Sequence, residues 1–149
     1  DKQNFVYAAL RTLASGAPFA AASDAVITPT YVPDLVQTCL DLLIDQEHGI
    51  WHLATPTPLS WADLARAAAE MAGLDPSGVH ERPLEAFDLP ARRPCYSALG
   101  SERGVLLRPL DGAMEHYFDE SISTGLLQRP TRLALAPAGK RRVKVRKAS

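Results

Sequence analysis

The chain has little cysteine and no long apolar run, and both shortages narrow the kinds of protein it can be. Its two cysteines, Cys39 and Cys95, are far apart and form no CxxC pair. A disulfide would imply a secreted protein, but the first residues show no basic segment followed by an apolar one. We therefore expect a cytoplasmic protein with Cys39 as a buried free thiol. No apolar run approaches the roughly 18 residues of a transmembrane helix, so no membrane partner is expected.

The glycine-rich turns of nucleotide-binding proteins are also absent. No GxGxxG, GxxGxxG or GxxxxGK[ST] occurs, so no glycine turn brings the backbone against a pyrophosphate. Tyr-x-x-x-Lys is missing too. The nearest pattern pairs Tyr7 with Arg11, and an arginine cannot replace a lysine that lowers the pKa of a tyrosine. The chain therefore carries no complete catalytic set of its own.

The sequence supports neither a zinc site nor a serine nucleophile. His48 and His52 are four residues apart, but Gly49 begins an expected strand between them, so they share no helical face and zinc is not expected. Ser101 in GSERG lacks the flanking pattern of a nucleophile elbow.

Charge divides the chain into an acidic body and a basic tail. The first 120 residues hold all 17 acids and eight Lys or Arg, a net charge of −9. The tail holds the other eight, which are Arg129, Arg132, Lys140, Arg141, Arg142, Lys144, Arg146 and Lys147. Three interpretations are open: a disordered extension, a salt-dependent contact with nucleic acid or another anionic surface, or a stretch created by a frame change or fusion junction.

Hydrophobic periodicity predicts alternating helices and short strands in one domain. Helices are expected over residues 2–15, from Pro33-Asp34 to about 43, from an N-cap at Ser60 to Gly73, and over 109–118. Strands are expected on either side of a turn at Ser23-Asp24, in GIWHLA at 49–54 with Ile50 and Leu53 buried, and over 79–82. Residues 83–104 contain too many prolines for a regular element. The alternation favours an α/β fold, and the few strands indicate part of a sheet.

Three segments in this order resemble the C-terminal half of the dTDP-4-dehydrorhamnose reductase family, which belongs to the extended short-chain dehydrogenases/reductases. They are ITPTYVPDLVQTCLDLLID, GIWHLATPTPLSWADLARAAAEMAGL, and ARRPCYSALGSERG with LLRPLDGAMEHYF behind it. The resemblance covers residues 1–118. It implies a substrate-binding lobe there, truncated at its N-terminal side. Residues 119–149 lie outside the resemblance, and their scattered leucines, proline, glycine and like charges predict a basic, disordered tail.

The resemblance also implies that cofactor binding and proton transfer belong to one half of the enzyme and substrate binding to the other. In the family, an N-terminal Rossmann half binds NADPH and carries the Thr/Ser, Tyr and Lys of proton transfer, so that a 4-keto dTDP-sugar is reduced to dTDP-L-rhamnose. That half would lie in the same or a separate chain. We therefore expect this chain to bind a dTDP-sugar, to bind no cofactor alone, and to be inactive alone. The alternative is a non-catalytic module, similar to the regulatory subunit of methionine adenosyltransferase, which would leave the RRPxxS loop unexplained.

The arginine pair provides the strongest candidate site. Arg92 and Arg93 precede a proline in an irregular loop, and a guanidinium group matches a phosphate with two parallel hydrogen bonds. The resemblance places this loop over the substrate, with Ser97 as a hydrogen-bond donor. Of the two arginines, Arg93 is ranked as the better candidate for binding the ligand. The alternative is an ion pair with Glu81 or Glu85.

Three hydroxyl groups form a second candidate set. Thr28, Thr30 and Tyr31 lie where the chain turns into a helix, and the resemblance points that junction toward the cleft between the lobes. The alternative is that Tyr31 packs and Thr30 satisfies the turn. Trp51 and Trp61 are expected to pack rather than to stack on a ligand.

Overall fold

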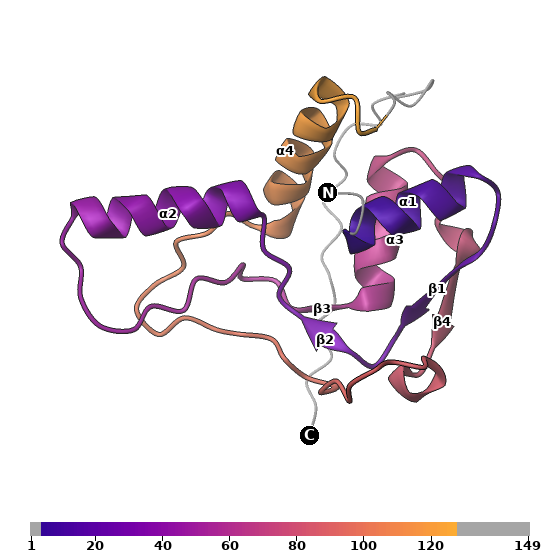
Figure 1. Ribbon diagram of the computed structural model, residues 1–149, viewed down its shortest axis with the longest axis horizontal. Coiled ribbons are helices and arrows are strands. Elements are labelled where there is room, and N and C mark those ends of the chain that lie inside the picture. The colour runs from indigo at the N-terminus through magenta and orange to yellow at the C-terminus, as the bar shows by residue number, and fades with distance from the viewer. Residues whose placement is uncertain (1–3, 128–149) are drawn as a thin grey trace.

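The computed structural model describes residues 4–127, in which the helices lie to one side of two short sheets (Figure 1). The helices are α1 (Phe5–Ala14), α2 (Val32–Ile44), α3 (Trp61–Met71) and α4 (Leu110–Ser123), with short 3-10 turns η1 (Pro76–Gly78) and η2 (Leu84–Ala86). The strands are β1 (Phe19–Ala22), β2 (Val26–Ile27), β3 (Leu59–Ser60) and β4 (Val79–Arg82). The predicted α/β class is confirmed.

Local capping explains where two of the helices begin and end. The Asn4 side chain accepts hydrogen bonds from the first turn of α1, and Gly16 follows that helix at a φ of 78°. The predicted N-cap of α3 is confirmed, because the Ser60 hydroxyl accepts from the Asp63 N–H at 3.0 Å. Gly73, at a φ of 68°, lies just beyond the last turn of α3, as predicted.

The strands form two separate two-stranded sheets. β1 pairs in parallel with β4, with Phe19 opposite Val79, and β2 pairs antiparallel with β3, with Val26 opposite Ser60. Strands were therefore predicted correctly on both sides of the turn at 23–24, but they belong to different sheets. The turn carries the chain from one sheet to the other and opens a space between them.

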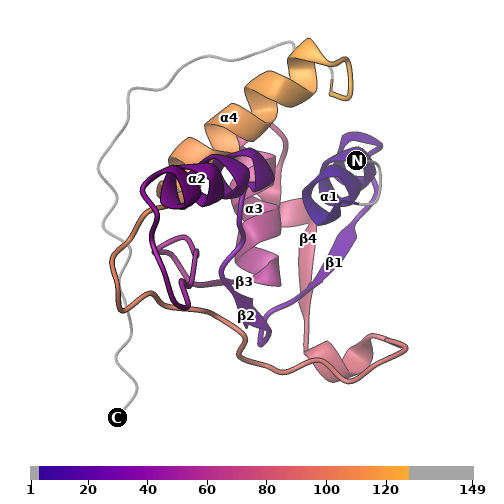
Figure 2. The same ribbon diagram turned by 60° about the vertical axis from the view of Figure 1, so that its left-hand side comes forward.

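The core is built largely from small side chains. One cluster packs α1 and α3 on the first sheet through Ala9, Ala21, Ala62, Ala65 and Val79. A second joins α1, α3 and α4 through Leu10, Leu64, Ala68, Leu110, Met114 and Phe118. Both views show α1 beside α3, with α4 above them (Figures 1 and 2). Alanine at the contacts allows the helices and the sheet to approach closely.

α2 and the segment after it differ from the prediction. α2 extends away from the other helices, and none of its residues is buried (Figure 1). Cys39 is exposed, so the predicted buried thiol is wrong. The predicted strand at 49–54 does not form either, and Ile50 is 82% exposed. Both errors have one physical reason: within residues 4–127, no sheet lies against this side of the molecule.

The last helix is longer than predicted. α4 continues past residue 118 to Ser123, because Phe118 and Ser121 are both buried against the body. Leu127 packs against the same core. The predicted boundary between lobe and tail at 118 therefore falls inside α4. All eight basic residues of the tail lie outside the described residues. None of the helices within 4–127 is long and apolar enough to cross a bilayer.

Candidate functional site

The proline-rich segment 83–97 is held at both ends, by the turn between β1 and β2 and by β2 itself. At its start, the Leu84 N–H donates to Asp24 Oδ1 at 2.7 Å. At its end, the Val26 N–H donates to the Cys95 carbonyl at 2.8 Å, and the Ser97 N–H donates to the Val26 carbonyl at 2.9 Å. Residues 95–97 thus run alongside β2 as an additional parallel bridge. This anchoring fixes the arginine loop over the space between the two sheets.

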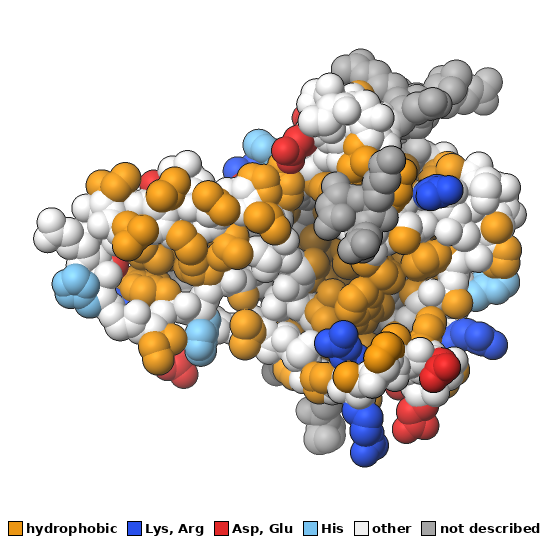
Figure 3. Space-filling view, in the orientation of Figure 1, with side chains coloured by type: hydrophobic (Ala, Val, Ile, Leu, Met, Phe, Trp, Pro, Cys, Tyr) orange, Lys and Arg blue, Asp and Glu red, His pale blue; other side chains and the backbone are white. Residues whose placement is uncertain are grey.

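A cavity of about 640 Å³ occupies that space. Its walls are mainly apolar and come from β1, β2, the starts of α1 and α3, and the loop. Phe5, Trp61, Phe87 and Leu89 are among the large side chains. Arg93 and Ser97 are part of the same lining. Apolar side chains surround the hollow between β1 and β2 in the space-filling view (Figure 3). The loop therefore adds a cation and a hydroxyl to an apolar pocket.

The aromatic wall of the cavity is braced by its own packing. The Phe5 ring meets Trp61 edge to face, with ring centroids 4.5 Å apart, and meets Phe19 at 5.5 Å. Trp61 therefore packs, as predicted, and also lines the cavity. The pocket suits a ligand with a flat apolar part next to an anionic group. Phe5 and Phe87 were not identified from the sequence, because only the tertiary fold brings them to the arginine loop.

The two predicted arginines have different positions. Both are exposed, but Arg93 lines the cavity and Arg92 does not. Neither forms an ion pair with any residue between 4 and 127. Glu81 instead pairs with Arg66 at 2.6 Å, so the alternative contact from the arginine loop to Glu81 is not made. The Arg93 guanidinium is accordingly available to an anion.

The three predicted hydroxyl groups lie elsewhere and already have partners. Thr28 Oγ1 accepts from the Leu99 N–H at 3.2 Å, and the Thr30 hydroxyl donates to the Thr28 carbonyl at 3.5 Å. The Tyr31 phenol donates to Glu120. Desolvation, followed by the hydrogen bond to Glu120 and its negative charge, raises the pKa of Tyr31 to about 12. None of the three lines the Arg93 cavity, and their role in ligand binding remains a prediction.

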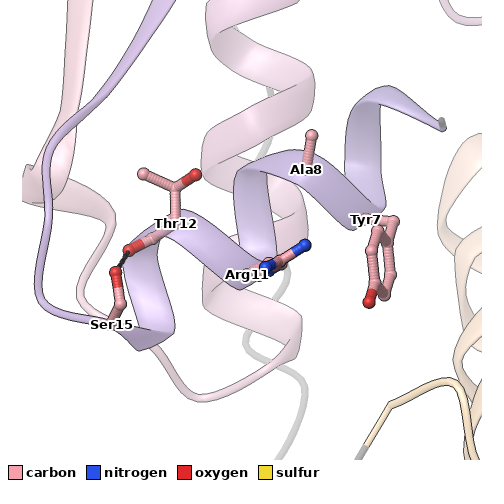
Figure 4. A pocket seen from close by; sticks show the side chains of 5 residues that line it. All are labelled: Tyr7, Ala8, Arg11, Thr12 and Ser15. Carbon is pink, nitrogen blue, oxygen red and sulfur yellow. Dashed lines mark hydrogen bonds between the residues drawn. The ribbon is translucent and has the colours of Figure 1, made fainter. Parts of the chain in front are cut away.

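A second, shallower depression lies on α1 alone. It is lined by Tyr7, Ala8, Arg11, Thr12 and Ser15 and has a volume of about 420 Å³ (Figure 4). The Ser15 hydroxyl donates to the Thr12 carbonyl at 2.7 Å, so this donor is already used. Among residues 4–127, no other element lines the depression, and it offers a ligand little burial. Across residues 4–127, no three His, Cys, Asp or Glu side chains gather as a metal site.

The helix N-termini do not fit the pyrophosphate of a nicotinamide cofactor. The first turns of α2, α3 and α4 carry Asp34, Asp63 and Asp111, whose negative charges would repel it. The first turn of α1 is already capped by Asn4. These helix ends and the missing glycine turn give no feature typical of a dinucleotide site, and the expectation that this chain binds no cofactor alone stays a prediction.

The fold is an α/β lobe in which two short sheets flank a largely apolar pocket that includes Arg93 and Ser97 in its lining. The family model described as the RmlD substrate binding domain matches residues 1–110, and the chain belongs to this family. The resemblance identified from the three sequence segments is thereby confirmed. The match gives no support to a nucleic-acid-binding role for the basic tail.

The chain is also similar to individual proteins. It is 38% identical over 107 residues to dTDP-4-dehydrorhamnose reductase of Mycolicibacterium smegmatis, which covers 70% of this chain and 32% of that protein. The crystal structure of the Clostridium acetobutylicum orthologue superposes with a TM-score of 0.73 at 27% identity, over 80% of this chain and 44% of that one. The Bacillus anthracis reductase, solved in complex with NADP, superposes with a TM-score of 0.70 at 26% identity, over 79% of this chain and 43% of that one. The chain therefore spans less than half the length of these relatives.

Proposed function

We propose that this chain is the substrate-binding part of a dTDP-4-dehydrorhamnose reductase, an NADPH-dependent oxidoreductase of dTDP-rhamnose biosynthesis. One observation carries the proposal: Arg93 and Ser97 line the same largely apolar cavity of about 640 Å³. The family match and the similarity to known reductases support the substrate class. A dTDP-sugar combines a flat pyrimidine, two phosphates and a hydroxylated ring, and the cavity has complementary groups for the first two.

Each part of the ligand has a candidate partner in the cavity. The pyrimidine would pack against the aromatic wall formed by Phe5, Trp61 and Phe87. The diphosphate would lie at the mouth, where the Arg93 guanidinium can donate two hydrogen bonds to one phosphate. The Ser97 hydroxyl, whose contact with the Val26 carbonyl is long at 3.4 Å, can turn to donate to the ligand. Arg93 also offsets the repulsion that an acidic body exerts on an anion.

Reduction itself is assigned to residues beyond this chain. Within the whole reductase, the proton-transfer residues and the nicotinamide cofactor would be held by another half, in the same or a separate polypeptide. The present residues offer neither a Tyr-x-x-x-Lys pair nor a fitting pyrophosphate site, so the isolated chain is expected to bind substrate without turning it over.

Calorimetric titration with dTDP-rhamnose tests the proposal, with NADPH titrated in parallel. We expect dTDP-rhamnose to bind, NADPH not to bind, and Arg93→Ala to abolish the heat of binding. Arg92→Ala is the matched control, because it removes a neighbouring charge outside the cavity. A chain that unfolds in a sharp thermal transition but binds no dTDP-rhamnose would contradict the proposal, and so would equal binding by Arg93→Ala.

A further inference from the structure

A smaller pocket lies on the other side of residues 96–98 from the Arg93 cavity. It has a volume of about 290 Å³ and is walled by two segments, 54–58 and 96–105. Residues 95–97 run alongside β2, and in an extended chain neighbouring side chains point to opposite faces. Ser97 accordingly lines the Arg93 cavity, whereas Tyr96 and Ala98 line the smaller pocket. We call it the Tyr96 pocket. The two cavities share no lining residue.

The Tyr96 pocket is uncharged. Its lining includes no Lys, Arg, Asp or Glu from the described part of the chain. The nearby Arg103 is already engaged, because it pairs with Glu47 at 3.1 Å and donates to the His48 carbonyl at 2.7 Å. Its volume is less than half that of the Arg93 cavity. The pocket therefore suits neither a phosphate nor a whole nucleotide, both of which need a cation.

The polar groups of the pocket are hydroxyls and backbone amides, and several lack a partner. Ser101 Oγ is buried but has no hydrogen-bond partner among residues 4–127. The Gly100 and Ser101 N–H groups form no backbone hydrogen bond within the same residues. The Thr55 hydroxyl donates to the Pro29 carbonyl at 3.0 Å, so its oxygen can still accept. Buried polar groups are rarely left without a partner, so Ser101 points to a ligand.

Apolar surfaces lie beside these polar groups. Pro56 and Pro58 come from one segment, and the Tyr96 ring, which is 67% exposed, comes from the other. The negative face of an aromatic ring attracts the weakly positive C–H groups of a saturated ring. A pyranose ring has C–H groups on its faces and hydroxyls around its rim, and the hydroxyls both donate and accept. The pocket offers a partner for each of these features.

We propose that the Tyr96 pocket binds an uncharged monosaccharide ring, at a site separate from the Arg93 cavity. The Tyr96 ring would cover one face of the sugar. The Ser101 hydroxyl and the neighbouring N–H groups would donate to the sugar hydroxyls, and the Thr55 oxygen would accept from one of them. The inference does not rest on the proposed function, because it concerns residues that the Arg93 cavity does not use.

The first experiment titrates methyl α-L-rhamnoside, an uncharged pyranose, into the full chain labelled with ¹⁵N. Amide chemical shifts report where the sugar binds. A ligand of this size makes few contacts, so we expect a Kd on the order of millimolar. The largest shifts should fall on the amides of Gly100 and Ser101. The absence of any saturable shift would overturn the inference, as would shifts confined to the residues around Arg93.

Two variants test the groups that would hold the sugar. Ser101→Ala should weaken binding about fivefold, because one hydrogen bond is lost. Tyr96→Ala should weaken it by roughly tenfold, because the stacking surface is lost. Ser123→Ala is the matched control, since it removes an exposed hydroxyl on α4 that donates to the Glu120 carbonyl. An unchanged Kd in both pocket variants would contradict the proposal.

Two further probes test the chemical class on the unmodified chain, so they do not depend on how a variant folds. Cyclohexanol keeps the six-membered ring but has one hydroxyl, and it should bind at least about fivefold more weakly than methyl α-L-rhamnoside. Inorganic phosphate should leave the Gly100 and Ser101 amides unshifted. Equal or tighter binding of cyclohexanol would show a merely apolar pocket. Either that result or a phosphate-induced shift would refute a monosaccharide site.

The sugar site and the proposed function fail separately. Arg93→Ala should abolish binding of dTDP-rhamnose and leave the Kd of methyl α-L-rhamnoside unchanged. A Kd for the rhamnoside that rises in Arg93→Ala would show that the sugar shares the Arg93 cavity, which would overturn the inference of a separate site. Binding of the rhamnoside at Gly100 and Ser101 without any binding of dTDP-rhamnose would refute the proposed function alone.

Discussion

Tyr31 and Glu120 are 89 positions apart in the chain and are joined by a hydrogen bond from the phenol to the carboxylate. The bond ties the start of α2 to the C-terminal half of α4. An ion pair reinforces this hydrogen bond at the start of α2: Arg108 pairs with Asp34 at 2.6 Å, and the Asp34 side chain is only 13% exposed. α2 has no buried residue, so these polar contacts at its N-terminal end contribute much of what orients it.

Replacing Tyr31 by phenylalanine removes the hydrogen bond while keeping the ring. We expect a loss of about 1 kcal/mol in the free energy of unfolding, reduced if solvent reaches the pair. Urea denaturation at pH 7 measures it. Tyr96→Phe is the matched control, since that ring is 67% exposed, and it should leave stability unchanged. An equal loss in both variants would show that the contact with Glu120 contributes nothing.

The pH dependence of this contribution follows from the raised pKa of Tyr31, about 12 against an ordinary 10. In the unfolded chain the phenol ionises first, so the folded state holds more protons above pH 10. The stabilisation is therefore complete below pH 10 and is lost as the pH rises through 12. The difference in stability between wild type and Tyr31→Phe should be constant from pH 7 to 9 and shrink above 10. A difference that grows with pH would contradict the assignment.

Arg93→Lys separates charge from hydrogen-bond geometry in the cavity. Lysine keeps the positive charge but cannot make the paired contact of a guanidinium with a phosphate. We expect dTDP-rhamnose to bind about tenfold more weakly in Arg93→Lys, and Arg93→Ala to be weaker still. Calorimetry measures both. If Arg93→Lys binds as well as wild type, the arginine acts only through its charge.

The N-cap of α3 gives a prediction about stability alone. Ser60 is 7% exposed, and its hydroxyl satisfies the Asp63 N–H. Ser60→Ala should cost about 1 kcal/mol, because the Asp63 N–H in the first turn of α3 loses its partner. Thermal unfolding measures the change. Ser15→Ala removes an exposed hydroxyl at the end of α1 and should have a much smaller effect.

Trp51 can report on a contact that joins the end of α2 to the loop after the cavity. The Arg103 guanidinium lies 3.7 Å from the centre of the Trp51 ring and pairs with Glu47 at 3.1 Å. Arg103→Ala should cost about 0.5–1 kcal/mol and shift the tryptophan fluorescence. Phe substituted for Trp61 assigns the signal, because it leaves Trp51 as the sole tryptophan. An unchanged emission spectrum in that background would show that the cation does not rest on the ring.

Local patterns were reliable where a helix or strand carries its own signals. The cap at Ser60, the stops at Gly16 and Gly73 and the strand at 79–82 all follow from neighbouring residues, and each is present. The arginine loop was proposed as a binding segment from its chemistry, and its ligand remains a prediction. Which of its two arginines reaches a cavity was decided by the anchoring of residues 95–97 along β2, a contact between segments about 70 residues apart.

The sequence by itself determined the class of fold, the capped helices and the family, because all three depend on short patterns read in order. Only the tertiary structure decided that Phe5, Trp61 and Phe87 share one cavity with Arg93, since these residues come from distant segments. The tertiary structure also explains why the strand predicted at 49–54 does not form. GIWHLA has the composition of a strand, yet a strand exists only when another strand pairs with it, and residues 4–127 offer none at that position.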